Sequence, residues 1–384
     1  MFSLLLPIIY LTFISLGLPD SMLGAAWPSM QPDFGVSVSY VGIVFFIVCC
    51  CTTLSSLFSD RLTRQFGAGP VTAVSVFVSA ASMLGFSVSG SFWLICILAL
   101  PYGFSAGCID AAINNYVAVH YASRHMSWLH CMWGVGSTVG PMVMGWVLTA
   151  GHSWPVGYRC VGIIQLVIAL IVVMSLPQWK KRSGSDGEGD KPSEAMTMAQ
   201  IVRLPGAKEV FVSFFCYCAL EQTAMLWASS YLSARAGASP ELAATLGSLF
   251  CIGITAGRAA SGFVTYKLND TQMIRLGHAI IGMGTIIMLL PVPLCKMAGL
   301  ILVGLGCAPV YPCIIHSTPA HFGAERSQAV IGIEMASAYV GCTLMPPVFG
   351  LIAQYIDISL LPLMLIALLV LEFGMYEKVV KICD

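Results

Sequence analysis

Long apolar stretches alternate with short polar breaks along the whole chain. The stretches fall at about 2–30, 39–59, 69–89, 92–118, 127–150, 157–177, 207–233, 241–265, 271–293, 297–319, 327–354 and 358–376. A helix crosses the apolar part of a bilayer with roughly 20 residues, so each stretch is long enough for one span. The pattern predicts an all-α membrane protein with twelve transmembrane helices.

One polar break, at 178–206, is much longer than the others. It contains the run SGSDGEGD at 183–190, a composition typical of a flexible, solvated linker. The break leaves six spans on either side. We therefore predict an N-terminal six-helix bundle at 1–177, a linker at 178–206 and a C-terminal six-helix bundle at 207–384.

The composition supports a membrane protein and excludes several other classes. Of the 384 residues, 58% are hydrophobic and only 9% are charged, against roughly 25% charged in a soluble domain. The 18 basic and 18 acidic residues balance, so no basic excess is present to bind nucleic acid. Nearly all of the 15 cysteines lie in apolar stretches at spacings that match no metal motif. We interpret them as packing residues and expect no metal.

The positions of the basic residues predict the orientation. If the N-terminus is inside, fourteen of the 18 bases lie on the cytoplasmic side, three lie on the opposite side, and Arg258 stays within a span. This bias follows the positive-inside rule. The prediction is a multi-pass protein of the cell membrane, with both termini and the linker in the cytoplasm.

The two halves also resemble each other in sequence. Three positions of GSTVGPMVMG recur 205 residues later in GCTLMPPVFG: Gly136, Pro141 and Gly145 match Gly341, Pro346 and Gly350. Together with the layout of six spans and six, this repeat argues for an internal duplication. Two pseudo-equivalent bundles around a central cavity suit transport by alternating access.

A charged turn follows the second predicted span. Residues 56–65 read SLFSDRLTRQ and resemble the G-x-x-x-D-R-x-G-R-K loop of the major facilitator superfamily. Asp60, Arg61 and Arg64 match this pattern, whereas its two glycines and its lysine are absent. In that family the loop holds the inside closed by charge pairing, so the resemblance implies a cytoplasmic gate of Asp60, Arg61, Arg64 and, from the second-half copy, Arg258. An ordinary basic turn is the alternative.

Four acids stand out within the predicted spans: Asp20, Asp110, Glu221 and Glu334. An ionised carboxylate at membrane depth is costly unless it faces a wet cavity, finds a partner or takes a proton, so these residues are functional candidates. A carboxyl group in a cavity of low dielectric can load and release a proton. It can alternatively bind two sugar hydroxyls, or contribute an oxygen ligand to a sodium ion.

Asp110 has the most specific surroundings in the sequence. It lies in GFSAGCIDAAINN at 103–115, and Asn114 follows one helical turn later on the same face. The next span starts near His130 and continues as G-x-G-x-x-x-G-P. These motifs resemble the fucose permease-like branch of the superfamily, which implies sugar recognition by Asp110 and Asn114, and Asp110 is also a cation-coupling candidate. His130 replaces that branch's glutamine, and it could bond a hydroxyl or titrate near neutral pH.

Asp20 and Glu334 are the other coupling candidates. The same branch keeps an acid ahead of a proline in its first span, where it is tied to proton coupling. Asp20 lies about one turn further from Pro28 than that pattern requires, and a carboxylate that caps the helix break at Pro19 is the alternative. Glu334 either takes part in coupling or forms a structural ion pair with Arg258.

The seventh span combines polar residues with an aromatic stripe. Glu221 and Gln222 precede Trp227 and Tyr231, which are four residues apart. We predict that Glu221, Gln222 and Trp227 bind substrate opposite the residues of the first half, and packing or lipid contact of the aromatic residues is the alternative. His316 in the tenth span is a candidate cavity residue, with a position at the cytoplasmic interface as the alternative.

Together these features predict a secondary active transporter that takes up a monosaccharide, a hexose or deoxyhexose, in symport with a proton or sodium ion. Proton-coupled export of a drug or metabolite is the alternative, because the fifth span partly resembles an antiporter motif. A sensor would leave four buried acids unexplained. An enzyme is not expected, since no nucleophile elbow, phosphate loop or metal cluster occurs. We expect no cofactor beyond the coupling ion, no nucleic-acid partner, and a monomer in the lipid bilayer.

Overall fold

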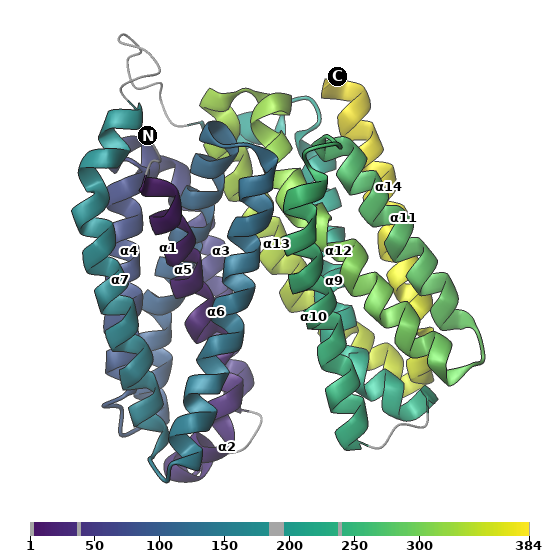
Figure 1. Ribbon diagram of the computed structural model, residues 1–384, viewed down its shortest axis with the longest axis horizontal. Coiled ribbons are helices and arrows are strands. Elements are labelled where there is room, and N and C mark those ends of the chain that lie inside the picture. The colour runs from purple at the N-terminus through teal and green to yellow at the C-terminus, as the bar shows by residue number, and fades with distance from the viewer. Residues whose placement is uncertain (1–3, 37–39, 184–195, 237–239, 384) are drawn as a thin grey trace. The chain divides into compact units, whose positions relative to one another are not determined.

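Long helices joined by short connections make up the chain (Figure 1). The structure, a computed structural model, describes residues 4–36, 40–183, 196–236 and 240–383. The helices of the first half are α1 (Leu5–Asp20), α2 (Met22–Phe34), α3 (Val41–Phe66), α4 (Ala68–Phe86), α5 (Phe92–His120), α6 (Ser123–Thr149) and α7 (Trp154–Ser183). Those of the second half are α8 (Met198–Val202), α9 (Ala207–Ala236), α10 (Pro240–Val264), α11 (Asp270–Leu289), α12 (Pro293–Phe322), α13 (Ala324–Ile352), the short η2 (Ala353–Asp357) and η3 (Ile358–Leu360), and α14 (Leu361–Cys383).

These helices follow the predicted spans, with ends shifted by a few residues. Only Ser21 separates α1 from α2, and Pro19 lies two residues before it. The two helices therefore form one span with a bend. In the described part of the chain, ten stretches are long and apolar enough to cross a membrane. One of them runs through both α13 and α14, and the further helix α10 has 25 residues. The order of elements thus contains the twelve expected spans.

Contacts within the chain divide it into two units. Unit 1 consists of Met1–Tyr116 and Leu129–Met196, and unit 2 consists of Val117–Trp128 and Thr197–Asp384. Unit 2 therefore includes the turn between α5 and α6, in addition to the helices of the second half. The predicted bundles at 1–177 and 207–384 place that turn with the first half instead.

The predicted linker begins later than the polar composition suggests. Helix α7 continues as far as Ser183, and residues 184–195 lie outside the described part of the chain. The short helix α8 follows, and its first turn is fixed by a capping box in which Thr197 and Gln200 bond each other's backbone N–H groups. Part of the predicted linker is therefore helical.

A repeated glycine sets the close approach of helices in both units. Gly136 of α6 lies so near the carbonyl oxygen of Ile14 on α1 that an added Cβ would collide with it. Gly341 of α13 meets the carbonyl oxygen of Phe215 on α9 in the same way. Only glycine allows two backbones to approach so closely. These two positions belong to the predicted sequence repeat, so the repeat corresponds to equivalent packing in the two units.

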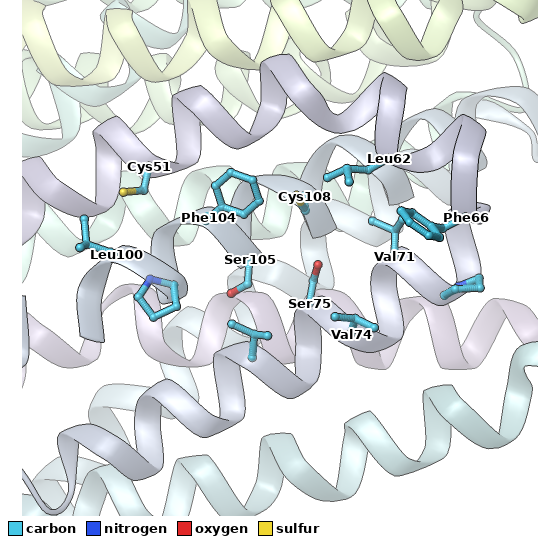
Figure 2. Close-up of a pocket in the computed structure, with 13 residues that line it drawn as sticks. Cys51, Leu62, Phe66, Val71, Val74, Ser75, Leu100, Phe104, Ser105 and Cys108 are labelled. Carbon is cyan, nitrogen blue, oxygen red and sulfur yellow. The ribbon is translucent and has the colours of Figure 1, made fainter. Parts of the chain in front are cut away.

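An apolar cavity of about 660 Å³ lies between α3, α4 and α5 of unit 1 (Figure 2). Its lining is almost entirely apolar and includes the exposed side chains of Phe66, Val74, Leu100 and Phe104. A wall of this kind offers very few hydrogen-bonding groups to a polar solute. None of the predicted site residues lines this cavity.

Candidate functional site

Three predicted residues of unit 1 form one hydrogen-bonded row. The Asn114 amide nitrogen donates to the Asp110 Oδ1 at 2.7 Å and to its backbone oxygen at 2.9 Å. The Asn114 Oδ1 lies 3.0 Å from the Nε2 of His130. Since that amide oxygen can only accept, Nε2 of the imidazole carries the hydrogen in this arrangement. All three side chains are buried, so the row presents a carboxylate, an amide and an imidazole in a fixed order.

Both carboxylate oxygens of Asp20, the last residue of α1, accept hydrogen bonds from aromatic side chains. The Tyr102 hydroxyl on α5 donates to Oδ1 at 2.7 Å, and the Trp133 indole N–H on α6 donates to Oδ2 at 2.8 Å. The backbone N–H of Ser21 bonds Pro19 at the break, and the Ser21 side chain provides no cap. The carboxylate of Asp20 therefore accepts hydrogen bonds from side chains of α5 and α6. The residue also remains exposed within the chain.

Helices α1, α5 and α6 together position the site of unit 1. His130 and Trp133 lie one turn apart on α6, and the ring of Phe13 on α1 meets the ring of His130 edge-on at 5.4 Å. The close contact at Gly136, described above, holds α1 against α6. Asp20 and the row around Asn114 are therefore linked to the same three helices.

In unit 2 the centre of the polar cluster is Glu221 on α9. The Nη2 atom of Arg258 on α10 lies 3.3 Å from Glu221 Oε1, and the Tyr217 hydroxyl contacts the other carboxylate oxygen. The same hydroxyl lies 2.8 Å from the backbone oxygen of Cys307 on α12. Arg258 is only 3% exposed, and a buried guanidinium needs a carboxylate partner. The sequence assigned Arg258 to the gate, but the structure pairs it with a predicted substrate residue.

The aromatic residues that follow on α9 pack against neighbouring helices. The Trp227 indole N–H donates to the backbone oxygen of Pro346 at 3.0 Å, and its ring meets Phe349 edge-on. Tyr231 is buried, and its hydroxyl donates to the backbone oxygen of Met288 at 3.1 Å. Gln222 is half-buried. The donors of Trp227 and Tyr231 are thus engaged by protein backbone, which corresponds to the packing alternative for the stripe.

Glu334 has a hydroxyl as its hydrogen-bond partner. It is fully buried on α13, and the Thr318 hydroxyl on α12 lies 3.0 and 3.1 Å from its two carboxylate oxygens. The sequence left open an ion pair between Glu334 and Arg258. In the structure Arg258 bonds Glu221 instead. Glu334 therefore links α12 to α13, apart from the cluster at Glu221.

The charged turn at the end of α3 contains an ion pair within one helix. The Nε of Arg64 donates to Asp60 Oδ1 at 2.8 Å, one turn away. Asp60 is buried, and its second oxygen has no hydrogen-bond partner among the described residues, whereas Arg61 is exposed. Two of the three matched residues, Asp60 and Arg64, thus form an ion pair within α3.

Within unit 2, a second polar cluster joins the turn between α5 and α6 to α11 and α12. The His316 Nδ1 lies 2.6 Å from Asp270 Oδ2, and its Nε2 lies 2.9 Å from the backbone oxygen of Tyr121. The Ser123 hydroxyl also bonds Asp270. We call these four residues the latch. His316 therefore lies at a junction of helix ends, bonded to Asp270 and to the backbone of Tyr121.

Four polar residues that the sequence did not single out bond other polar side chains in the structure. Tyr217 lies one helical turn before Glu221, Trp133 lies one turn after His130, and Tyr102 lies two turns before Asp110, so helical spacing could have identified these three. Glu372 is an acid within the last predicted span, and it would have been found by counting the acids of every span. It pairs with His278 on α11. No group of three His, Cys, Asp or Glu residues in the described part of the chain is arranged to hold a metal ion.

Known proteins resemble this chain over most of its length. Residues 9–297 match the family described as Major Facilitator Superfamily. The sequence is 24% identical to Bypass of stop codon protein 6 of Saccharomyces cerevisiae, over 96% of this chain and 81% of the relative. It is 19% identical to the glucose/mannose transporter GlcP of Bacillus subtilis, over 79% and 77%. It is 21% identical to the 4-hydroxybenzoate transporter PcaK of Pseudomonas aeruginosa, over 69% and 66%.

Solved structures share the fold. The outward conformation of FucP, a transporter of the same superfamily, superposes with a TM-score of 0.79 at 13% identity, and the match covers 96% of this chain and 98% of that one. A second structure of FucP, a variant described as the fucose:proton symporter of E. coli, gives 0.78 at 12% identity over 97% and 98%. At this identity the likeness establishes the fold, and it confirms the predicted all-α arrangement with twelve spans.

Proposed function

Because the chain belongs to the Major Facilitator Superfamily, we propose that this multi-pass membrane transporter takes up a monosaccharide, a hexose or deoxyhexose, together with a proton. The chain moves a small molecule and is not an enzyme. Uptake would proceed by alternating access, in which the polar clusters of the two units are exposed first to one side of the membrane and then to the other. The observation that carries the substrate class is the row of Asp110, Asn114 and His130.

A sugar suits this row because each hydroxyl both donates and accepts. The carboxylate of Asp110 is a hydrogen-bond acceptor for sugar hydroxyls. A sugar in this site would exchange its own hydrogen bonds for those that Asn114 makes to Asp110 and His130. A buried site built to bond hydroxyls rejects analogues that lack them, since its polar groups are then left unpaired. The likeness to a glucose/mannose transporter supports the same substrate class.

A proton suits the coupling site better than a sodium ion. The two oxygens of Asp20 face an O–H and an N–H donor, from Tyr102 and Trp133. Sodium requires several oxygen ligands, and the indole N–H of Trp133 provides none. A carboxyl group can instead take up and release a proton without any further ligand. The likeness to a fucose:proton symporter supports this choice.

The proposal is tested by counterflow of labelled hexoses into proteoliposomes. Asp110→Asn removes a charged hydrogen-bond partner worth about 1.5–3 kcal/mol, so exchange should fall roughly ten- to hundredfold. Asp33→Asn is the matched control, because Asp33 is an acid of unit 1 that bonds Trp154 at 2.7 Å outside the row. No exchange of any hexose refutes the sugar proposal, and full exchange by Asp110→Asn refutes the site.

The coupling ion is tested separately in the same vesicles. Addition of a transported hexose should make the outer medium more alkaline, equally with and without sodium, because each sugar enters with a proton. A pH change that requires sodium, or uptake driven only by a sodium gradient, would exclude proton symport.

A second function is favoured by one observation in unit 2. Arg258 is a buried cation beside Tyr217 and Tyr311, and guanidinium groups bind carboxylates well. The 4-hydroxybenzoate transporter among the relatives moves an aromatic carboxylate. A metabolite of this kind, exported in exchange for protons, is the alternative substrate. Labelled 4-hydroxybenzoate in the same vesicles distinguishes the two, because a sugar transporter should not exchange it.

We also propose that the protein is a monomer of the cell membrane with both termini in the cytoplasm. The excess of basic residues on one side of the spans supports this orientation. Protease cleavage of a C-terminal tag in sealed cells would contradict it, whereas cleavage only after permeabilisation is expected.

A further inference from the structure

A second pair of ionisable side chains lies in unit 2, outside the site just described. The Nε2 of His278 on α11 lies 2.6 Å from Oε1 of Glu372 on α14. The two residues are 5% and 0% exposed. The outer atoms of the pair, Nδ1 of His278 and Oε2 of Glu372, are buried and have no hydrogen-bond partner among the described residues.

The surroundings of the pair are mostly apolar. The His278 ring meets the rings of Phe373 and Tyr376 edge-on at 5.6 and 6.2 Å. Among the described residues, the titratable groups that interact with the pair are Cys216 on α9, Cys307 on α12, and Tyr376 and Glu377 on α14. Glu377 forms an ion pair at 2.7 Å with Arg275 on α11. The charge of Glu377 is therefore balanced by Arg275, and the described neighbours leave little charge to balance a net charge on the pair.

The net charge of such a pair depends on how many protons it binds, not counting the one N–H hydrogen that a neutral imidazole always keeps. With one proton between them, the imidazole and the carboxyl group are together neutral, wherever the proton lies. With two protons the pair is positive, and with none it is negative. A net charge in an apolar interior is costly, so this packing favours one bound proton. Release requires that the helices around the pair change their positions or admit water.

Unit 1 has a neutral counterpart of this pair. Gln165 is the twelfth residue of α7, as Glu372 is the twelfth of α14, and α7 packs on α1 and α4 as α14 packs on α9 and α11. The Gln165 amide nitrogen donates to the backbone oxygen of Ser15 at 2.7 Å and to the Ser79 hydroxyl at 3.1 Å. A brace at this place in the fold thus needs no ionisable group.

The pair also lies close to the cluster around Glu221. Cys216, which faces Glu372, precedes Tyr217 in the chain, and Tyr217 contacts Glu221. Cys307 on α12 interacts electrostatically with both carboxylates, and its backbone oxygen accepts from Tyr217. A shift of α9 or α12 that follows solute binding would therefore alter the surroundings of the pair.

We infer that His278 and Glu372 form a proton-binding site beside the cluster around Glu221, and that this site carries a coupling proton. The coupling role rests on the proposed proton-linked transport, whereas proton binding itself does not. The site differs from Asp20 in being closed off from the surface of the chain. It holds its proton until the packing of α9, α11, α12 and α14 changes.

Proton binding is tested on the purified full-length protein without any substrate. Infrared difference spectra between two pH values should contain a band of the pair, either the carbonyl band of a carboxylic acid or the ring band of an imidazolium. Glu372→Gln should remove the acid band or weaken the imidazolium band, and His278→Gln should shift the first or remove the second. Gln165→Leu, which removes the neutral brace of unit 1, is the control and should leave the band unchanged. A spectrum identical in the wild type and both pair variants would overturn the inference.

Coupling is tested in proteoliposomes. Glu372→Gln should abolish accumulation driven by a pH gradient, whereas counterflow, which needs no net movement of protons, should persist. Unchanged accumulation would overturn the coupling role. If the wild type exchanges no hexose, the proposed function fails, and the infrared band still decides whether the pair binds a proton. If Glu372→Gln does not fold, His278→Gln and the double variant His278→Leu with Glu372→Leu provide the same comparison.

Discussion

Neutralising Glu221 should destabilise the protein far more than breaking an exposed ion pair. Glu221→Gln removes the carboxylate that lies 3.3 Å from Nη2 of Arg258, and the two side chains are 17% and 4% exposed. A buried guanidinium is then left without its counter-ion, which costs about 3–5 kcal/mol. Each kcal/mol changes the melting temperature of a unit of this size by about 2–4 °C. We expect a decrease of about 6 °C or more.

Thermal unfolding of the purified protein in detergent, followed by tryptophan fluorescence, measures this decrease. Arg258→Gln should also destabilise, because it leaves the Glu221 carboxylate with fewer donors. The double variant, with two amides in place of two charges, should regain most of the loss. Arg235→Gln is the control. It breaks an exposed pair with Asp357, whose side chains are 38% and 44% exposed, and such pairs contribute about 1 kcal/mol or less.

Two results would refute this reasoning. The first is a Glu221→Gln melting temperature that falls no further than that of the Arg235→Gln control. The second is a double variant whose loss equals the sum of the two single losses, because additive losses mean that the two side chains do not interact. Either result would show that Arg258 is stabilised by something other than Glu221.

Two further predictions concern helix packing and the latch. Gly136→Val and Gly341→Val should each lower stability by about 1–3 kcal/mol, because the added side chain forces two backbones apart. Gly145→Val, where an added Cβ has nothing within 4 Å, should have no such effect in the same unfolding assay. In a variant that retains Cys313 as its single cysteine, His316→Ala should speed maleimide labelling of that thiol, which lies 3.9 Å from the Ser123 hydroxyl of the latch. Unchanged labelling would show that the hydrogen bonds of His316 do not limit access to the Cys313 thiol.

Local spacing was sufficient to predict the contacts that lie within one helix. Asp110 and Asn114 are four residues apart, and their side chains bond as that spacing implies. Asp60 and Arg64 have the same spacing and also bond each other, although the sequence was used to predict only a gate there. The positions of the spans followed from the lengths of the apolar stretches, because a membrane-spanning helix has a nearly fixed length. The superfamily resemblance, carried by a short charged turn, is confirmed by the family match.

Contacts between helices could not be predicted in this way. The choice of Glu221 as the partner of Arg258 depends on which faces of α9 and α10 meet, and no spacing within either helix determines that. The stripe of Trp227 and Tyr231 has a regular spacing whether it lines a cavity or packs against a neighbour. Its donors bond backbone oxygens on other helices, and the spacing within α9 could not predict these contacts. The identity of the sugar and the roles of the site residues stay predictions.

Helix α5 carries Asp110 and Asn114 and ends next to the latch, at His120. Asn114 is counted in unit 1, whereas the last residues of the helix and Tyr121, which follows it, are counted in unit 2. The hydrogen bond between His316 and the backbone oxygen of Tyr121 therefore fastens the end of the same helix that carries Asp110 and Asn114. A variant that breaks the latch would act on this helix from its end, without changing any residue of the row.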